Sequence, residues 1–336
     1  MKNVLIFGAG AIGSTVAAWL ADTDANIYIY DRESTCNKIN QNGIESYWGD
    51  EPQKRYKANV SAYFDLDFIP KPDLIILCVK NFSLAGVSQL LVDKFGDAVP
   101  VVGLQNGVEN QTVLPKFFKH VIYGVVCYNA WVDELAVVGY QKKGPIALGQ
   151  KGGVQQQIMK DIAKLFAKGV ETDLPDNFND AAHSKIVINL ANSLTTLVAL
   201  HQNDLSGSRE FQKLLTSMTY EGVKVMEAAG YKESKLGGMP GWLLIKAAGR
   251  LPGFLTRRPY LKNLKKMVIS SMAQDVIVNG GGASELETIN GYVLALADQY
   301  GVSVPVNRAV YEICKKEFAK QPFTPLTVNE IWQQVA

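Results

Sequence analysis

The hydrophobic pattern of this chain changes about halfway along its 336 residues. In the first half, short runs of apolar residues alternate with longer segments that have apolar residues every three or four positions. Short runs that are apolar on both faces are typical of parallel strands buried in a sheet, and the longer segments are typical of helices. The predicted strands are Val4–Phe7, Ile27–Tyr30, Leu74–Val79, Val99–Leu104 and Val121–Val126, and the helices between them include Leu84–Lys94.

The pattern then shifts towards helix. A mixed strand region is predicted at Ala136–Gly139 and Ile146–Leu148, followed by a helix over Val154–Lys168 and a last strand near Val170–Leu174. From Asn179 onward the periods are long and helical, with few strand signals. We therefore predict an α/β domain over residues 1–177 and an all-helical domain over residues 178–336.

A glycine-rich turn joins the first strand to an amphipathic helix. Gly8-x-Gly10-x-x-Gly13 stands where a dinucleotide-binding βαβ unit needs it. Gly8 permits the tight turn, Gly10 lets the backbone approach a pyrophosphate, and Gly13 lets the helix pack close to the strand. The N–H groups at the start of the helix favour an anion. The predicted cofactor site therefore includes Gly8, Gly10, Ala11, Ile12 and Gly13.

Asp31 and Arg32 follow the second strand and bear on the choice of nucleotide. An acidic residue at this point usually accepts hydrogen bonds from the ribose hydroxyls of NAD, whereas an arginine pairs with the 2′-phosphate of NADP. Strand alternation predicts that the two side chains point to opposite faces. Both residues are candidate cofactor contacts, and the residues alone leave the choice between NAD and NADP open.

Composition narrows the classes of partner. The net charge of +2 is too balanced to indicate a nucleic-acid-binding protein. The four cysteines are scattered without metal-ligand spacing, which favours free thiols in a reducing compartment and no metal site. We expect no signal peptide and no membrane span, because the first strand starts at once and no run of 18 apolar residues exists. The expected location is the cytoplasm.

Two further polar residues follow predicted strands. Lys80 ends the segment Asp73–Lys80, and Asn106-Gly107 ends the segment that begins at Val101. Open α/β sheets bind ligands at the carboxyl ends of their strands, where Gly8 also lies. A solvated lysine and a simple turn are the alternative interpretations, since Asn-Gly is a common turn signal.

A helix predicted around residues 183–193 carries polar residues on an otherwise apolar surface. Lys185, Asn189, Asn192 and Ser193 are spaced so as to form one polar stripe. Buried amides and charges need partners, so the stripe is either a catalytic or binding surface or a structural hydrogen-bond network. The three histidines, His120, His183 and His201, are isolated and are predicted to be structural.

The segment Gly280–Gly291 is a second candidate for site chemistry. Its sequence predicts a glycine hinge and a Ser284 N-cap before a helix that begins with Glu285 and Glu287. Carboxylates at a helix start also simply complement the helix dipole.

Taken together, these motifs resemble the ketopantoate reductase (2-dehydropantoate 2-reductase) family over nearly the whole chain. The matching pieces are GAGAIG at 8–13, CVK at 78–80, QNGVEN at 105–110, K-x-x-x-N at 185–189, ELETING at 285–291 and GVSVPVN at 301–307. The resemblance implies an α/β Rossmann dinucleotide-binding domain followed by an all-α C-terminal domain (6-phosphogluconate-dehydrogenase-like), with catalysis in the cleft between the two domains.

The resemblance also implies roles for individual residues. Lys185 matches the general acid and Glu285 the acidic catalytic residue, while the positions that bind substrate correspond to Asn106, Asn189, Ser193 and Ser271. Lys80, Arg32 and Asn106 match positions that contact the cofactor, which is expected to be NADPH with NADH usable. The expected reaction is reduction of ketopantoate to (R)-pantoate in pantothenate biosynthesis. A homodimer is one candidate assembly.

Some positions depart from the family pattern. Ser193 stands where the family has a second asparagine, with Asn192 one residue early, and Asp31 precedes the arginine. Residues 234–274 hold eight basic and no acidic residues, in a segment longer than that of the family. Two alternatives therefore stay open: an NAD-dependent D-2-hydroxy-acid dehydrogenase acting on another bulky 2-oxo acid, and a non-catalytic nucleotide-sensing module.

Overall fold

The computed structural model describes residues 1–150, 156–200, 202–203, 205–265, 267–278 and 284–335. Its contacts divide the chain into two compact units, Met1–Ala181 and Ala182–Ala336. The division falls within helix α6 (Phe178–Asn189), shortly after the domain boundary predicted at residues 177/178, which stays a prediction.

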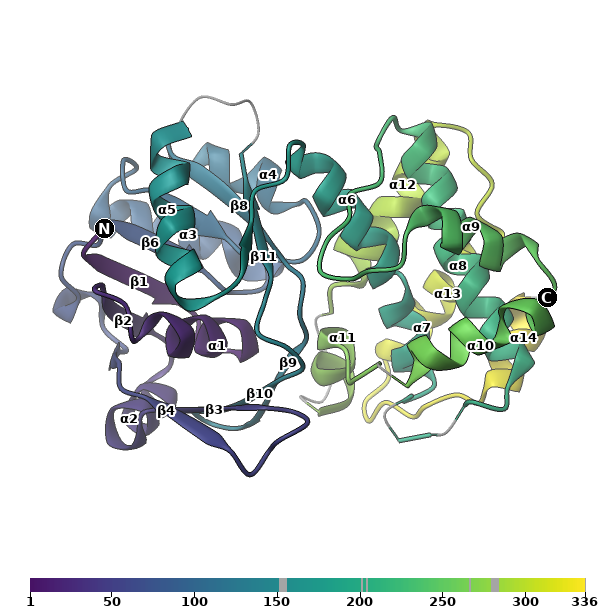
Figure 1. The fold of residues 1–336 in the computed structure, drawn as a ribbon, viewed down its shortest axis with the longest axis horizontal. Coiled ribbons are helices and arrows are strands. Elements are labelled where there is room, and N and C mark those ends of the chain that lie inside the picture. Colours follow the sequence, from purple (N-terminus) through teal and green to yellow (C-terminus); the bar gives the residue numbers. More distant parts are fainter. Residues whose placement is uncertain (151–155, 201, 204, 266, 279–283, 336) are drawn as a thin grey trace. The chain divides into compact units, whose positions relative to one another are not determined.

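A central sheet, eight-stranded over the described residues, forms the middle of the first unit (Figure 1). Its strand order is β12-β11-β8-β7-β6-β1-β2-β5, and the strands from β8 to β5 are parallel. β11 pairs antiparallel with β8, so the parallel arrangement expected from the sequence ends there. The strands are β1 (Asn3–Phe7), β2 (Asn26–Tyr30), β5 (Ser61–Tyr63), β6 (Leu74–Leu77), β7 (Val101–Gly103), β8 (Val121–Val126), β11 (Ile146–Gly149) and β12 (Thr172–Asp173).

Helices cover both faces of this sheet. α1 and α5 pack together on one face, and Figure 1 shows α3 behind the sheet on the other. Because both faces are covered, the central strands are apolar throughout, and all four residues of β6 are fully buried. The helices of this unit are α1 (Ala11–Leu20), α2 (Glu33–Asn42), α3 (Asn81–Phe95), α4 (Asn110–Val113) and α5 (Gln156–Gly169), with 3₁₀ turns η1 (Leu66–Phe68) and η2 (Leu114–Lys116).

A second, smaller sheet extends the first unit. It has the order β4-β3-β10-β9, formed by β3 (Ile44–Trp48), β4 (Arg55–Ala58), β9 (Ala130–Glu134) and β10 (Val137–Tyr140). The Tyr47 hydroxyl donates to Asp133 over 2.5 Å and accepts from Trp131 Nε1 over 3.0 Å, which ties β3 to β9. Of these strands the sequence predicted only the region of β10.

The second unit is helical, as expected, and its described residues contain no strand. Its elements are α7 (Ala191–Leu197), α8 (Arg209–Ala228), α9 (Trp242–Arg250), α10 (Gly253–Leu264), α11 (Ser271–Ala273), α12 (Tyr292–Gln299), α13 (Pro305–Phe318) and α14 (Val328–Val335), with π-helical turns η3 (Gln274–Val278) and η4 (Glu287–Gly291). In the described part of the chain, no helix is both long and apolar enough to cross a membrane.

The long helix α8 holds α13 in place through a buried carboxylate. Glu221 accepts the N–H groups of Val306 and Asn307 at 3.1 and 2.9 Å, and the Asn307 amide donates to Glu221 and to the Met218 carbonyl. A carboxylate is favourable there because the first N–H groups of α13 have no partner within the helix. The GVSVPVN motif therefore has a structural role.

Candidate active site

The glycine-rich turn has the backbone geometry that its motif predicts. Gly8 has a φ of +101°, a conformation that L side chains rarely adopt, and its N–H donates to the Tyr30 carbonyl over 2.9 Å. A Cβ added at Gly13 would stand 1.8 Å from the Gly8 carbonyl oxygen, so helix α1 approaches the turn as closely as glycine alone allows. The turn therefore holds the start of α1 against the end of β1.

The start of helix α1 can receive an anion. Its N-cap is Gly10, which makes no side-chain hydrogen bond, and its first turn has no acidic residue. A Cβ added at Gly10 would meet no described atom within 4 Å, so the backbone is open to approach here. The first N–H groups and the helix dipole together favour a phosphate, and these residues fit the pyrophosphate of a dinucleotide.

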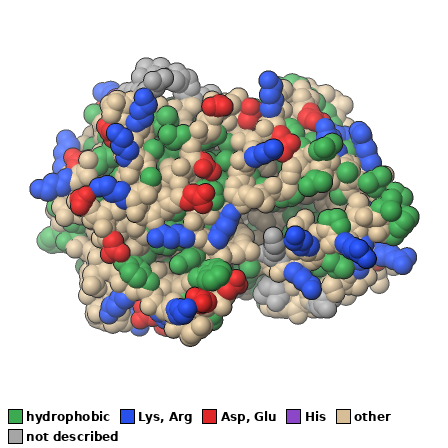
Figure 2. Space-filling model, viewed as in Figure 1, with side chains coloured by type: hydrophobic (Ala, Val, Ile, Leu, Met, Phe, Trp, Pro, Cys, Tyr) green, Lys and Arg blue, Asp and Glu red, His purple; other side chains and the backbone are tan. Residues whose placement is uncertain are grey.

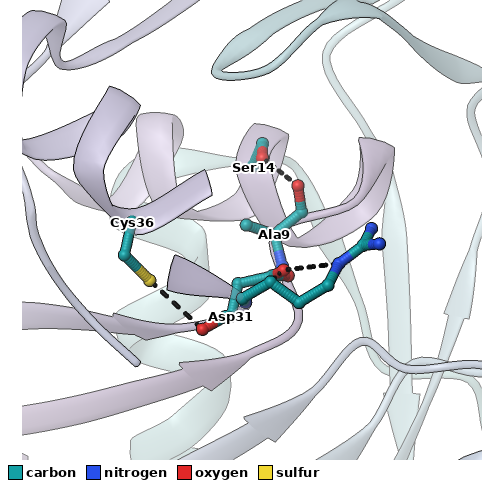
Figure 3. Close-up of polar contacts among 5 residues, drawn as sticks. Ala9, Ser14, Asp31 and Cys36 are labelled. Atoms are coloured by element: carbon teal, nitrogen blue, oxygen red, sulfur yellow. Dashed lines mark hydrogen bonds and ion pairs between the residues drawn. The ribbon is translucent and has the colours of Figure 1, made fainter. Parts of the chain in front are cut away.

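Asp31 lies beside this turn, close to Ala9 (Figure 3), and Arg32 contacts Asp31. Asp31 accepts the Ala9 N–H over 2.5 Å and the Arg32 N–H over 2.7 Å, and its Oδ1 is 3.8 Å from Arg32 Nε. The prediction that the two side chains point to opposite faces is wrong. Strand β2 ends at Tyr30, so strand alternation does not extend to these residues. The Arg32 side chain is 89% exposed.

Figure 3 also shows what anchors Asp31 and the turn. The Cys36 thiol donates to the Asp31 carbonyl over 3.3 Å, and the Ser14 hydroxyl donates to the Ala9 carbonyl over 2.9 Å. Both contacts come from the first or second turn of a helix, α2 for Cys36 and α1 for Ser14. Asp31 therefore links the end of β2 to the glycine-rich turn through its hydrogen bond with Ala9.

The predicted residues Lys80 and Asn106 also stand at strand ends of the same sheet. Lys80 is the N-cap residue of α3, just beyond β6, and the Asn81 amide donates to the Asn106 carbonyl over 2.9 Å. Gln105 joins the two loops more firmly, since its amide donates to the Leu77 and Val79 carbonyls at 2.8 and 3.2 Å. The sequence interpretation missed Gln105, although it is part of the QNGVEN motif.

These loops meet where the strand order reverses. The chain runs outward from β1 to β2 and β5 on one side, and from β6 to β7 and β8 on the other. The carboxyl ends of the strands at such a reversal form the usual binding crevice of an open α/β sheet. Burial raises the pKa of the neighbouring Cys78 thiol to about 12, which disfavours its nucleophilic thiolate form.

In the second unit, Lys185 and Asn189 lie one turn apart on α6 and are both half-buried. Ser193 does not share their exposure. It is fully buried, its hydroxyl donates to the Leu190 carbonyl over 2.9 Å, and it accepts the Asn290 amide over 3.0 Å. A helix turns about 100° per residue, so Ser193, eight positions after Lys185, points in a different direction from Lys185 around the helix axis. Substrate contact by Ser193 stays a prediction, and this burial argues against it.

The structure brings Ser271 and Glu285 together. The Ser271 hydroxyl donates to Glu285 Oε2 over 3.4 Å, and Glu285 is only 4% exposed. Ser271 opens α11, which packs against α7, and the Ser270 hydroxyl lies 3.4 Å from that of Thr196 on α7. π-Helical turns, which are frequent at functional sites, follow each of the two residues. The predicted glycine hinge at 280–283 lies outside the described residues.

The second carboxylate of this segment has a different partner. Glu287 accepts the Tyr311 hydroxyl over 2.6 Å, and burial together with this hydrogen bond raises the pKa of Tyr311 to about 12. The Ser284 N-cap is not found, since the π-helical turn begins at Glu287 with Leu286 as its N-cap residue. Of these two carboxylates, Glu285 is therefore the one that contacts another predicted site residue, Ser271.

His183 is part of the packing of α6. Its ring stacks on Tyr231 with centroids 3.5 Å apart, and its Nε2 lies 2.8 Å from the Tyr292 hydroxyl. Both contacts support the structural role predicted for it. No group of three potential metal ligands occurs in the part of the chain that the structure describes.

The first unit has the turn and sheet of a dinucleotide-binding domain, and the second is helical, with a lysine and a serine that contacts a buried carboxylate. Together they define a class, the Rossmann-type dinucleotide-dependent oxidoreductases. Comparison with models of protein families narrows this class to one family. Residues 4–153 match the model of ketopantoate reductase PanE/ApbA, and residues 177–317 match that of the ketopantoate reductase PanE/ApbA C-terminal domain. The chain belongs to the ketopantoate reductase family.

Relatives and solved structures agree with this assignment. The chain is 24% identical to a 2-dehydropantoate 2-reductase of Halobacterium salinarum over 93% of this chain and 98% of that one. It is 25% identical to the 2-dehydropantoate 2-reductase of Pyrococcus horikoshii, over 93% of this chain and 96% of that one.

Among solved structures, a PanE/ApbA family ketopantoate reductase from Ralstonia eutropha JMP134 has a TM-score of 0.75 at 22% identity, covering 99% of this chain and 100% of that one. D-Mandelate dehydrogenase with NADH and anilino(oxo)acetate has a TM-score of 0.77 at 20% identity, covering 94% and 98%. Both likenesses show the fold.

Proposed function

We propose that this chain is a 2-dehydropantoate 2-reductase, which reduces the 2-oxo group of ketopantoate to (R)-pantoate with NADPH in pantothenate and coenzyme A biosynthesis. The observation that carries the proposal is the group of polar residues in the second unit: Lys185 and Asn189 on α6, and half-buried Ser271 with buried Glu285. All four residues lie within the stretch matched by the C-terminal family model.

Dinucleotide binding is assigned to the first unit. The pyrophosphate would lie on the N–H groups of residues 10–13 at the start of α1, with Lys80 and Asn106 as further contacts at the same sheet edge. The nicotinamide, when bound, supplies a hydride to one face of the substrate carbonyl.

Lys185 is proposed as the general acid. As the carbonyl carbon gains the hydride, its oxygen takes a proton from Lys185 Nζ, and the neutral amine that remains is reprotonated from solvent. The positive charge of Lys185 also stabilises the negative charge that develops on that oxygen. Ser271 and the amides of Asn106 and Asn189 are hydrogen-bond donors suited to the substrate carboxylate and hydroxyl groups. Glu285 is proposed to orient Lys185 or the substrate.

NADPH is favoured over NADH by the geometry at the end of β2. Each carboxylate oxygen of Asp31 already accepts one backbone N–H group, which leaves fewer lone pairs for ribose hydroxyls. Arg32 contacts Asp31 through Nε, and its guanidinium extends into solvent, where it suits a 2′-phosphate.

An NAD-dependent D-2-hydroxy-acid dehydrogenase is the second candidate. The negative charge of Asp31 favours it, because a carboxylate repels a 2′-phosphate. The fold is also that of D-mandelate dehydrogenase, whose structure contains NADH.

A panel of 2-oxo acids tests these functions. The purified chain would be assayed with ketopantoate and phenylglyoxylate, each with NADPH and NADH, following loss of the reduced nicotinamide. We expect the highest kcat/KM for ketopantoate with NADPH. A higher value for phenylglyoxylate with NADH would favour the dehydrogenase, and cofactor binding without turnover of any acid would favour a nucleotide-sensing module.

A further inference from the structure

Helices α9 and α10 present an unusual surface on the second unit. Residues 234–274, which contain both helices, hold eight basic residues and no acidic one. Large apolar side chains of the same segment extend into solvent, and Phe254 and Leu243 are 78% and 75% exposed. The α9–α10 surface is formed by Leu243, Leu244, Leu251, Phe254, Leu255, Arg258 and Lys262, all of which are exposed.

The inner side of this helix pair is well anchored to α8. Arg257 donates to Gln212 Oε1 over 2.8 Å, and the Gln212 amide donates to the Gly253 carbonyl over 3.0 Å. Lys246 pairs with Glu227 over 2.7 Å, and Arg250 Nε donates to the Tyr220 hydroxyl over 3.0 Å. The exposed apolar side chains therefore belong to a fixed surface.

The outer side has apolar and basic residues at helical spacing. On α10, Phe254, Arg258 and Lys262 follow one another at intervals of four residues and lie on one face of the helix. Leu251 and Leu255 lie beside them, at the end of α9 and the start of α10. Figure 2 shows blue basic and green apolar side chains together over the region of α9 and α10, where few red ones occur.

We propose that the α9–α10 surface binds peripherally to an anionic lipid bilayer. Apolar side chains flanked by lysine and arginine, in a segment that holds no acidic residue, suit the interface of such a bilayer, where leucine and phenylalanine enter the acyl boundary and the cations stay with the phosphates. The other common occupant of an exposed apolar patch is a second protein chain. A symmetric contact with a second copy would place like charges opposite each other, which disfavours that occupant.

Flotation with vesicles tests the proposal. The full chain would be mixed with vesicles of equal parts phosphatidylcholine and phosphatidylglycerol, and with vesicles of phosphatidylcholine alone. We expect binding to the mixed vesicles, weak binding to the neutral ones, and a loss of binding as added salt screens the charges.

Two double variants separate the charged from the apolar contribution. Arg258→Glu with Lys262→Glu should weaken binding about 25-fold or more, since each cation near an anionic surface contributes a factor of about five. Phe254→Ser with Leu255→Ser should weaken it roughly tenfold. Matched controls are Lys160→Glu with Lys164→Glu on α5, and Phe64→Ser with Phe68→Ser in the first unit, which should bind like the wild type.

Three results would overturn the proposal: no binding to the mixed vesicles, equal binding to neutral vesicles, or binding that the α9–α10 variants and the controls reduce equally. A concentration-dependent dimer in sedimentation that Phe254→Ser with Leu255→Ser abolishes, without vesicle binding, would assign the surface to a second copy. The proposal is independent of the reductase activity, which the same variants should retain.

Discussion

Two glycines of the same motif are expected to respond to alanine in opposite ways. In Gly13→Ala the new Cβ would start 1.8 Å from the Gly8 carbonyl oxygen, whereas such contacts are essentially never shorter than 3.0 Å. Helix α1 or the turn must therefore move by more than 1 Å, and both are backbone packed against the sheet. Overpacking of this kind costs about 1–3 kcal/mol of the free energy of unfolding.

Gly10→Ala should leave the fold nearly as stable as the wild type. No described atom lies within 4 Å of the added Cβ, and the φ of Gly10, −71°, is normal for alanine. The expected cost is below about 1 kcal/mol, from the poorer N-cap. The methyl group instead occupies the approach of the pyrophosphate, so dinucleotide affinity should fall at least about tenfold, or 1.4 kcal/mol.

Urea denaturation without cofactor, together with fluorescence titration of NADPH, measures both effects. The reasoning is refuted if Gly13→Ala unfolds at the wild-type urea concentration, because the close contact would then be absent in solution. Wild-type NADPH affinity in Gly10→Ala would refute the assignment of the pyrophosphate to this turn.

The remaining predictions concern the other residues of the proposed site. Glu285→Gln should raise the KM for the 2-oxo acid and shift the pH profile of kcat/KM, with an unchanged dissociation constant for NADPH; if the KM and the pH profile are both unaltered, Glu285 is structural. Arg32→Ala should weaken NADPH binding at least about tenfold and NADH binding far less, because a bidentate contact with the 2′-phosphate is lost. Asp31→Asn should shift the cofactor preference further towards NADPH. If Arg32→Ala weakens the binding of both cofactors equally, the assignment of the 2′-phosphate to Arg32 is wrong. Ser193→Ala should lower the free energy of unfolding by about 1 kcal/mol, since the buried Asn290 amide loses its 3.0 Å hydrogen bond and keeps only the 3.5 Å one to the Leu190 carbonyl, while the KM stays near the wild-type value; a raised KM with unchanged stability would restore Ser193 to the substrate site.

The sequence predicted those features that depend on neighbouring residues. The strand–turn–helix of residues 4–13 was recognisable because the glycine spacing, the apolar strand and the helix are continuous in the chain. The buried strands β1 and β6 were equally clear, since both faces of each are apolar. The change to an all-helical second unit also followed from periodicity alone.

Features that depend on distant residues were missed or misjudged. The burial of Ser193 follows from contact with Asn290, about a hundred residues away, which no local pattern reveals. The Asp31–Arg32 prediction was wrong for another reason: it extended strand alternation past Tyr30, the residue at which both the predicted strand and β2 end. Strand β4 was missed because three of its four residues are exposed, and β3 was missed because the polar residues Glu45 and Ser46 interrupt its apolar pattern.

The most direct test of the account is the reaction of Lys185→Ala with ketopantoate. Enzyme saturated with NADPH would be mixed with ketopantoate, and the loss of reduced nicotinamide would be followed beside the wild type, with the dissociation constant for NADPH measured on the same samples. The account predicts that turnover falls about 10²–10⁴-fold, the usual contribution of a positioned proton donor, while NADPH binding is unchanged. Wild-type turnover in Lys185→Ala would contradict the proposed mechanism.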